Sequence, residues 1–274
     1  ICISNYCIMK KAKLFFLGIG VIALLSQCGV SISDLKKVNL ISIEQDRELG
    51  LQVSQEIDNN PAEYPVLDSG QNTKIYQYLY DIRNRILNSG KVKHKDNFAW
   101  RLRIIQDDQT KNAFCTPGGY IYVYTGLMKY LDTETQLAGV LAHEIGHADL
   151  RHSTVQMTKL YGVQTLIGIL AGNRENLAQL TTSIIGLRFS RGHETEADQA
   201  SVTYLCPTDY DAAGGAQFFE KIEAEGGASM PEFLSTHPNP ENRIESFYTE
   251  KQVQNCTGAQ TFQSRYDNMM RLLP

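Results

Sequence analysis

The sequence predicts an α+β fold that is mostly helical, with a small three-stranded sheet beside a central helix. Residues 73–87 carry aliphatic side chains at helical spacing, so this helix should bury one face. These side chains are Ile75, Leu79, Ile82 and Ile86. Residues 98–105 alternate between apolar and polar side chains, and residues 112–115 and 120–124 supply two further strands.

Turns divide the first half of the chain. Residues 43–57 predict a polar helix, and residues 61–70 predict a loop. A charged turn contains His94, so this side chain is expected in solvent. Gly118 and Gly119 predict the turn that joins the second strand to the third.

Two apolar segments follow the central helix. Residues 154–170 and 180–189 are expected to form ordinary core helices, separated by a polar stretch. The alternative is a mobile segment over a cleft, with Gly162 and Gly168 as hinges. The first segment is too short and too polar to predict a membrane span. Residues 211–226 predict one more helix.

The central helix ends in the motif His143-Glu144-Ile-Gly-His147. A spacing of four puts both histidines on one helix face, about one turn apart. Two neutral imidazoles there can bind one Zn²⁺, while Glu144 is offset enough to take a proton from a water molecule. This pattern predicts a zinc hydrolase. For the motif alone, the alternative is an amphipathic helix with solvated or hydrogen-bonded histidines.

A hydrolytic zinc site takes three protein ligands, so a third must come from elsewhere in the chain. Residues 190–204 predict a second helix, on which Glu194 and Asp198 are four apart and face the same way. One carboxylate can bind the metal, and the other can accept the free N–H of a ligand histidine. The alternative is an ordinary acidic helix face with solvated charges, among them Glu196.

Two further motifs accompany these helices. Residues 112–119 are Asn-Ala-Phe-Cys-Thr-Pro-Gly-Gly, and residues 235–244 are Ser-Thr-His-Pro-Asn-Pro-Glu-Asn-Arg-Ile. With His-Glu-x-x-His and Ser-Arg-x-x-Glu-x-Glu-Ala-Asp, they resemble the soluble gluzincin zinc metallopeptidases related to HtpX and the CAAX prenyl protease. The chain resembles in particular the bacterial periplasmic BepA- and LoiP-like lipoprotein proteases, without the tetratricopeptide domain. The resemblance covers residues 43–247.

The resemblance implies a role for each motif residue. Glu194 matches the third zinc ligand, beside His143 and His147. Asp198 matches the residue that orients a ligand histidine, and Glu144 matches the general base. The implied enzyme is a zinc-dependent metalloendopeptidase with one Zn²⁺ per chain.

The sequence allows more than one role for several polar residues near these motifs. His237 and Arg243 match polar groups near the metal, and either could stabilise the oxyanion of the reaction. His237 could instead be a structural hydrogen-bond donor, or a fourth zinc ligand that holds the enzyme off. Cys115 has no predicted role beyond that of a small buried hydrophobe. His152 lies one turn too far for ligation and is expected at the surface.

The resemblance also implies how substrate binds. An edge strand containing Asn112, Ala113 and Phe114 would run along the cleft, so an extended peptide could add to it as another strand. Such binding is largely blind to side chains. It suits an endopeptidase that hydrolyses unfolded or misassembled envelope proteins, as in protein quality control. The alternative is a periplasmic chaperone or assembly factor whose proteolysis is silenced or secondary.

The start of the chain has the pattern of an exported lipoprotein. Residues 1–8 have the character of translated upstream sequence, and residues 9–27 combine a short basic region with an apolar run, as a signal peptide does. Leu-Ser-Gln-Cys28 resembles a bacterial lipobox, although a smaller residue than Gln27 is usual. The alternative is a plain signal peptide.

A lipid on Cys28 would anchor the protein without a transmembrane helix. Gly29 favours the outer membrane, on the periplasmic side of the bacterial cell envelope. Residues 28–42 would then form a tether, and residues 43–274 the zinc metallopeptidase domain.

Charge and cysteine content limit the partners. The formal net charge is −4, and the chain has no basic runs, which argues against nucleic acid as a partner. An exported chain can hold a disulfide, and we predict one between Cys206 and Cys256. The alternative is that these cysteines and Cys115 are all free, because sequence alone does not fix connectivity.

Overall fold

The computed structural model describes residues 39–226, 231–238 and 242–274. The predicted signal peptide at 9–27 and lipidation site Cys28 lie outside the described residues. Among the residues that are described, no helix combines the length and the apolar character that a membrane span requires.

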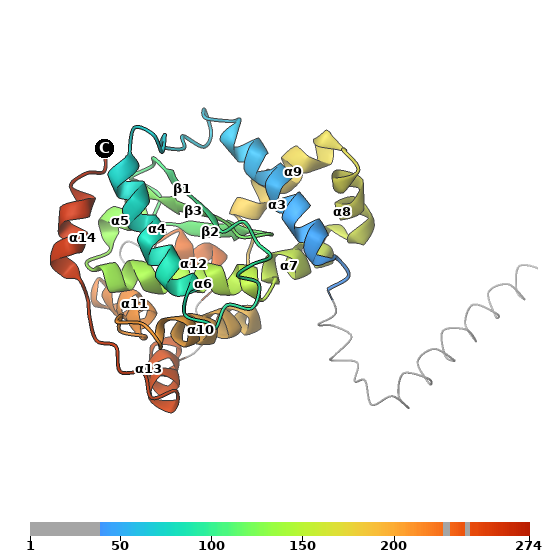
Figure 1. The fold of residues 1–274 in the computed structure, drawn as a ribbon. Helices are drawn as coiled ribbons and strands as arrows, with labels where there is room; N and C mark the ends of the chain where they lie inside the picture. The colour runs from blue at the N-terminus through green and yellow to red at the C-terminus, as the bar shows by residue number, and fades with distance from the viewer. Residues whose placement is uncertain (1–38, 227–230, 239–241) are drawn as a thin grey trace, which may run out of the picture. The chain divides into compact units, whose positions relative to one another are not determined.

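Helices surround one small sheet, as the α+β prediction requires (Figure 1). The helices are α3 (Ile43–Asp58), α4 (Thr73–Leu87), α5 (Thr125–Tyr130), α6 (Glu134–Asp149), α7 (His152–Tyr161), α8 (Val163–Leu170), α9 (Arg174–Ile185), α10 (Arg191–Leu205), α11 (Gly214–Ala224), α12 (Phe233–Thr236), α13 (Arg243–Val253) and α14 (Gln263–Met270). The strands are β1 (Arg101–Ile105), β2 (Ala113–Thr116) and β3 (Tyr120–Tyr124). The predicted fold class is therefore confirmed.

The sheet has the strand order β1-β3-β2, so β2 lies at one edge. β1 runs parallel to β3, while β2 runs antiparallel to β3 and pairs Phe114 with Tyr122. Gly118 and Gly119 form the predicted turn with φ angles of 72° and 81°. Residues that carry a side chain rarely adopt such positive φ angles. This tight turn places β2 beside β3, with the metal-motif helix against it.

Most element boundaries follow the sequence pattern, and the exceptions have local causes. α4 spans the predicted residues 73–87. β1 begins at Arg101 and not at residue 98, because Trp100 has a φ of 46° and interrupts the extended backbone. The polar stretch before residue 180 belongs to α9, since the Asn173 side chain accepts a hydrogen bond from Asn176 N and starts the helix there.

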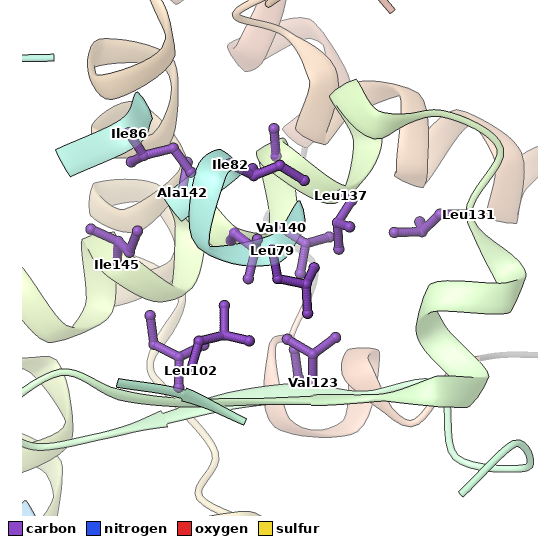
Figure 2. Packing of buried hydrophobic residues seen from close by; sticks show 14 of the residues in the cluster. Leu79, Ile82, Ile86, Leu102, Val123, Leu131, Leu137, Val140, Ala142 and Ile145 are labelled. Atoms are coloured by element: carbon purple, nitrogen blue, oxygen red, sulfur yellow. The ribbon is translucent and has the colours of Figure 1, made fainter. Parts of the chain in front are cut away.

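The main core lies between the sheet, α4 and α6. Figure 2 shows that side chains of these three elements pack against one another in the space between the two helices and the sheet. They include Leu79 and Ile82 of α4, Leu102 of β1, Val123 of β3, and Leu137, Val140 and Ile145 of α6. Every residue of α6 is buried, so the helix that carries the metal motif is fixed from all sides.

Small residues let two helices approach α6 closely. A Cβ atom on Gly139 would lie 2.4 Å from Gly215 N of α11, so only glycine fits there. A Cβ atom on Gly146, inside the metal motif, would lie 3.2 Å from Ala197 O of α10. The second contact brings α10 and its carboxylates within reach of the two motif histidines.

The segment after α6 forms core helices, as predicted. α7 and α8 are separated at Gly162, whose φ is 77°, whereas Gly168 lies inside α8. Leu166, Ile169 and Leu180 are buried in a second hydrophobic cluster together with side chains of α3. Packing with α3 therefore explains the buried apolar residues of the segment, whereas Leu160 and Ile167 are exposed.

The prediction that His94 is solvated was wrong. His94 is buried, its backbone N–H donates to Asp149 Oδ1 at 2.6 Å, and its Nδ1 lies 2.9 Å from Asp149 O. Asp149 ends α6 and also accepts hydrogen bonds from Lys93 N and the Tyr204 hydroxyl. A buried carboxylate needs such donors, which draws the charged turn onto the end of α6.

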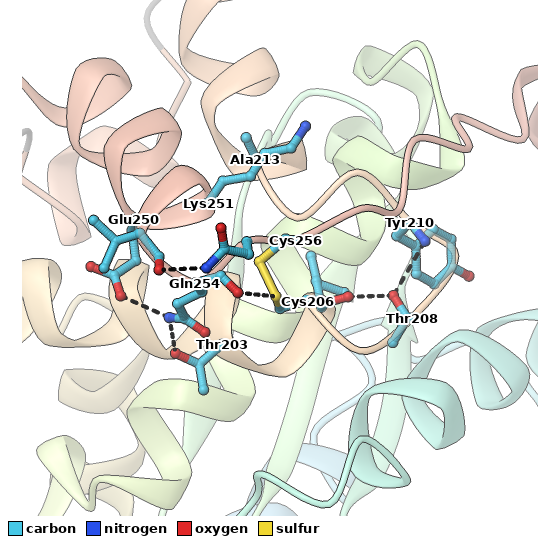
Figure 3. Close-up of a disulfide and its surroundings, with 12 residues drawn as sticks. Thr203, Cys206, Thr208, Tyr210, Ala213, Glu250, Lys251, Gln254 and Cys256 are labelled. Carbon is cyan, nitrogen blue, oxygen red and sulfur yellow. Dashed lines mark hydrogen bonds between the residues drawn. A yellow bond between two sulfur atoms is a disulfide. The ribbon is translucent and has the colours of Figure 1, made fainter.

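The structure joins Cys206 and Cys256 in a disulfide, as predicted (Figure 3). Cys206 follows α10, and Cys256 follows α13, so the bond links the ends of these two helices. Cys115 is buried and free, in agreement with its prediction as a small hydrophobe.

Candidate metal centre

Two imidazoles of α6 face the same point. His143 Nε2 lies 2.9 Å from His147 Nε2, as expected for residues four apart on one helix. The helix is started by Thr133, whose side chain accepts a hydrogen bond from Gln136 N. The motif thus presents two nitrogen donors from a rigid, buried element.

α10 supplies the third donor. Ser190 caps this helix by accepting a hydrogen bond from His193 N, and Glu194 lies in its first turn. Glu194 Oε2 lies 3.4 Å from His143 Nε2, and Glu194 Oε1 lies 3.4 Å from His147 Nε2. The predicted ligand set is therefore brought together around one point.

These groups fit a zinc ion. One donor atom each from His143, His147, Glu194 and His237 lies within 4.8 Å of the others, and all four residues are buried. Zinc sites of peptidases take three protein ligands of this kind and keep a fourth position for water, so His237 is one donor more than such a site needs. Buried imidazole and carboxylate donors that face one another in this way can be joined by one metal ion.

The electrostatics of the site favour a positive charge. Burial lowers the pKa of His143, but the carboxylates of Asp198 and Glu194 outweigh it and raise this pKa to about 9. Burial opposes ionisation of Glu194, yet the charges of His237 and His147 keep its pKa below the usual range. A cation at this point would interact with an ionised Glu194.

Asp198 and Arg243 form hydrogen bonds with the proposed ligands His143 and Glu194. Asp198 Oδ1 lies 2.8 Å from His143 Nδ1, which leaves Nε2 of this ring for the metal. The Arg243 guanidinium donates to Glu194 Oε2 at 3.2 Å and to Asp198 Oδ1 at 2.7 Å, and it packs over the Phe219 ring. These contacts direct Arg243 toward the two carboxylates.

His237, which follows α12, lies in the same cluster. Its Nδ1 is 3.2 Å from both His143 Nε2 and Glu194 Oε1, and its Nε2 is 3.5 Å from Glu144 Oε1. The Phe233 ring stacks on it with centroids 4.1 Å apart. The loop histidine therefore reaches the metal position as well as the predicted base.

Glu144 is fully buried, and neither of its carboxylate oxygens has a hydrogen-bond partner among the described residues. Burial raises its pKa, although the charges of His237 and His143 oppose this effect. A carboxylate in this state is suited to take up a proton and release it again.

The edge strand β2 lies against α6, with its side chains facing both ways. Ala113 belongs to the core cluster with α6, while Phe114 stacks on Tyr122 at 4.9 Å in the cluster with α3. Tyr124 N donates to Asn112 O, so the neighbouring Ala113 points its N–H to the outer edge, where Asn112 Oδ1 accepts it. The outer edge thus already has partners within the chain.

Sequence reasoning missed His152. It was expected at the surface, but it is 3% exposed, and its Nδ1 lies 3.0 Å from Nδ1 of His147. On an unbroken helix these residues would point in different directions. The helix breaks at Arg151, whose φ is 61°, and this turns His152 back toward the site. No local pattern in the sequence predicts that break.

This site, a pair of histidines on a buried helix with a glutamate from a second helix, defines a zinc metallopeptidase of the gluzincin type. The sequence model described as Peptidase family M48 matches residues 75–251, more than half of the chain. The chain belongs to peptidase family M48. The predictions of the family, of a metalloendopeptidase and of one zinc ion are thereby confirmed.

The relatives include mitochondrial metalloendopeptidases and a bacterial protease. The chain is 28% identical over 237 residues to the mitochondrial metalloendopeptidase OMA1 of Schizosaccharomyces pombe, covering 83% of this chain and 68% of the relative. It is 30% identical over 185 residues to the β-barrel assembly-enhancing protease of Escherichia coli K12, covering 61% of this chain and 37% of the relative. It is 33% identical over 163 residues to the mitochondrial metalloendopeptidase OMA1 of Danio rerio, covering 53% of this chain and 34% of the relative. The chain therefore spans little more than a third of two of these relatives.

Proposed function

We propose that this protein is an endopeptidase that cleaves unfolded or misassembled proteins of the bacterial cell envelope, held there by a lipid on Cys28. The observation that carries the catalytic part is the convergence of His143, His147 and Glu194 beside Glu144. The similarity to the E. coli assembly-enhancing protease supports the envelope. The OMA1 similarity fits a mitochondrial protease equally well, so the signal-like sequence at 9–28 decides our choice.

We assign the chemistry as follows. When bound, zinc would activate the attacking water and polarise the scissile carbonyl. His143, His147 and Glu194 would hold the ion. Glu144 would accept a proton from the water and pass it to the leaving amine, for which its buried carboxylate, without a hydrogen-bond partner among the described residues, is suited. Asp198 would keep the proton of His143 on Nδ1.

The extended substrate would add to the outer edge of β2. Ala113 points its N–H there, and Asn112 Oδ1, which now accepts this hydrogen bond, would have to release it to the peptide. Backbone pairing of this kind favours unfolded chains, because only they offer an extended segment. Asn112, Ala113 and Phe114 remain our proposed substrate-binding residues.

The structure resembles a closed state of such an enzyme, and we propose His237 as its closing ligand. His237 is 1% exposed, and Phe233 N of the adjoining helix donates to Lys111 O just before β2. Phe189 N donates to Thr236 O on the other side. A peptide would reach Glu144 only after this segment moves.

The closed site also favours a second candidate, an assembly factor whose proteolysis is silenced. The discriminating experiment is Glu144→Gln, with Glu223→Gln on the exposed surface of α11 as the matched control. For an endopeptidase, Glu144→Gln should bind zinc but lose hydrolysis by about 10²–10⁴-fold, and should no longer support function in cells. Full function in cells would select the assembly factor. Substrates trapped on the variant can be identified by mass spectrometry.

A further inference from the structure

The second ligand histidine has a partner of its own. His147 directs Nε2 to the metal position, since this atom lies 2.9 Å from His143 Nε2 and 3.4 Å from Glu194 Oε1. Its other nitrogen, Nδ1, lies 3.0 Å from Nδ1 of His152. The Nε2 atom of His152 in turn lies 3.1 Å from Glu196 Oε2.

These distances allow one arrangement of protons when a metal is bound. The metal takes the lone pair of His147 Nε2, so the proton of this ring must be on Nδ1. His152 Nδ1 then accepts that proton in a hydrogen bond, and the proton of His152 must be on Nε2. An ionised carboxylate such as that of Glu196 accepts hydrogen bonds and donates none. It is therefore a suitable acceptor for the N–H at His152 Nε2.

We propose that His152 is a positioning residue for zinc, which holds His147 in its metal-binding tautomer, and that Glu196 fixes the tautomer of His152. The inference rests on the ligand set proposed above. It gives His147 the support that Asp198 gives His143. It also gives Glu196, which is half exposed, a function beyond that of a solvated charge.

Packing holds the intermediate ring in place. The ring of His193 stacks on His152 with centroids 4.4 Å apart and planes within 10°, and Phe189 stacks on His147 at 4.0 Å. Arg151, which turns the chain before His152, forms an ion pair with buried Asp46 of α3. These contacts orient the rings of His152 and His147 through the protein itself.

The proposal predicts a loss of zinc affinity that depends on one nitrogen atom. His152→Phe keeps a ring in the stack but removes the acceptor, so the zinc dissociation constant should rise by about 10–100-fold. His152→Asn places an amide oxygen near the position of Nδ1 and should restore most of the affinity. His193→Phe is the matched control: it keeps the stack, and Nδ1 of His193 has no hydrogen-bond partner among the described residues. It should bind zinc as the wild type does.

Zn²⁺ titration of the metal-free full chain against a chelator measures all of these constants. Wild-type affinity in His152→Phe, or equal losses in His152→Phe and His193→Phe, would overturn the proposal. If His152→Phe does not fold, Glu196→Ala and Glu196→Gln replace it, since this side chain is 49% exposed. Glu196→Ala should weaken zinc binding more than Glu196→Gln, whose amide oxygen still accepts from His152. Equal constants for these two variants would contradict a role as acceptor.

The same titration separates this inference from the ligand assignment. Glu194→Ala removes a proposed ligand and should lose zinc in any case. If wild type and Glu194→Ala bind zinc equally, the ligand set is wrong. If Glu194→Ala loses zinc while every His152 variant keeps it, only the positioning role fails.

Discussion

His237 Nδ1 lies 3.2 Å from Glu194 Oε1, so a loop histidine and a predicted zinc ligand from a separate helix share one site. The two residues are far apart in the sequence and are brought together by α12 and α10. Because a peptidase zinc site needs one position for water, the presence of His237 there bears directly on activity.

His237→Ala should therefore raise the basal rate of peptide cleavage, since the position near the metal would become accessible. Zinc content should stay at one ion per chain, held by the other three donors. A peptide assay with parallel metal analysis measures both. A lower turnover rate with zinc still bound would show instead that His237 stabilises the transition state. An unchanged rate would mean that it is a structural hydrogen-bond donor.

Glu194→Ala should lose zinc and activity together. The change removes a donor atom, so the loss of zinc affinity should exceed the roughly 10–100-fold that removal of an outer partner costs. Glu223→Ala, at an exposed position of α11, is the control and should leave both unchanged. Full zinc occupancy and activity in Glu194→Ala would show that the third ligand is another residue.

Apparent zinc affinity should increase with pH up to about 9. In the metal-free protein burial lowers the pKa of His143, but the carboxylates of Asp198 and Glu194 raise it from 6.5 to about 9. Zinc must displace this proton below pH 9, and no longer has to above it, so affinity rises and then levels off. Chelator competition at several pH values measures the curve. In Asp198→Asn the plateau should start at lower pH, and a flat wild-type profile between pH 6.5 and 9 would contradict the prediction.

Loss of the disulfide should destabilise the protein without changing its chemistry. Cys206 and Cys256 are 50 residues apart in sequence, so the bond restricts the unfolded chain strongly. Replacing both by alanine should lower the free energy of unfolding by about 2–5 kcal/mol. Thermal or urea unfolding measures this, with reduced wild-type protein as the comparison. Equal stability of oxidised and reduced wild type would argue against the bond.

Cys28→Ser should release the protein from membrane fractions or block its maturation. This prediction depends on the lipobox-like sequence that ends at Cys28, which lies outside the described residues. Metabolic labelling with a palmitate analogue provides the direct measurement. If wild-type protein incorporates no label, the lipid anchor is absent, and the alternative of a plain signal peptide remains.

Local patterns in the sequence determined much of the fold. The helix at 73–87 has the predicted bounds, because the aliphatic residues that define its spacing are the residues that it buries. His143 and His147 were assigned from a spacing that one helix converts directly into a shared face. Glu194 required the resemblance to known peptidases, since its spacing alone also fits a solvated helix face.

Only the tertiary structure decided how the site is supported and closed. The buried positions of His94 and His152, and the place of His237 beside Glu144, depend on contacts between segments that are distant in sequence. The left-handed backbone at Arg151 separates α7 from α6 and turns His152 toward the site, and Arg151 forms an ion pair with Asp46 of α3. Periodicity describes one element at a time, so it cannot predict a turn that long-range packing stabilises.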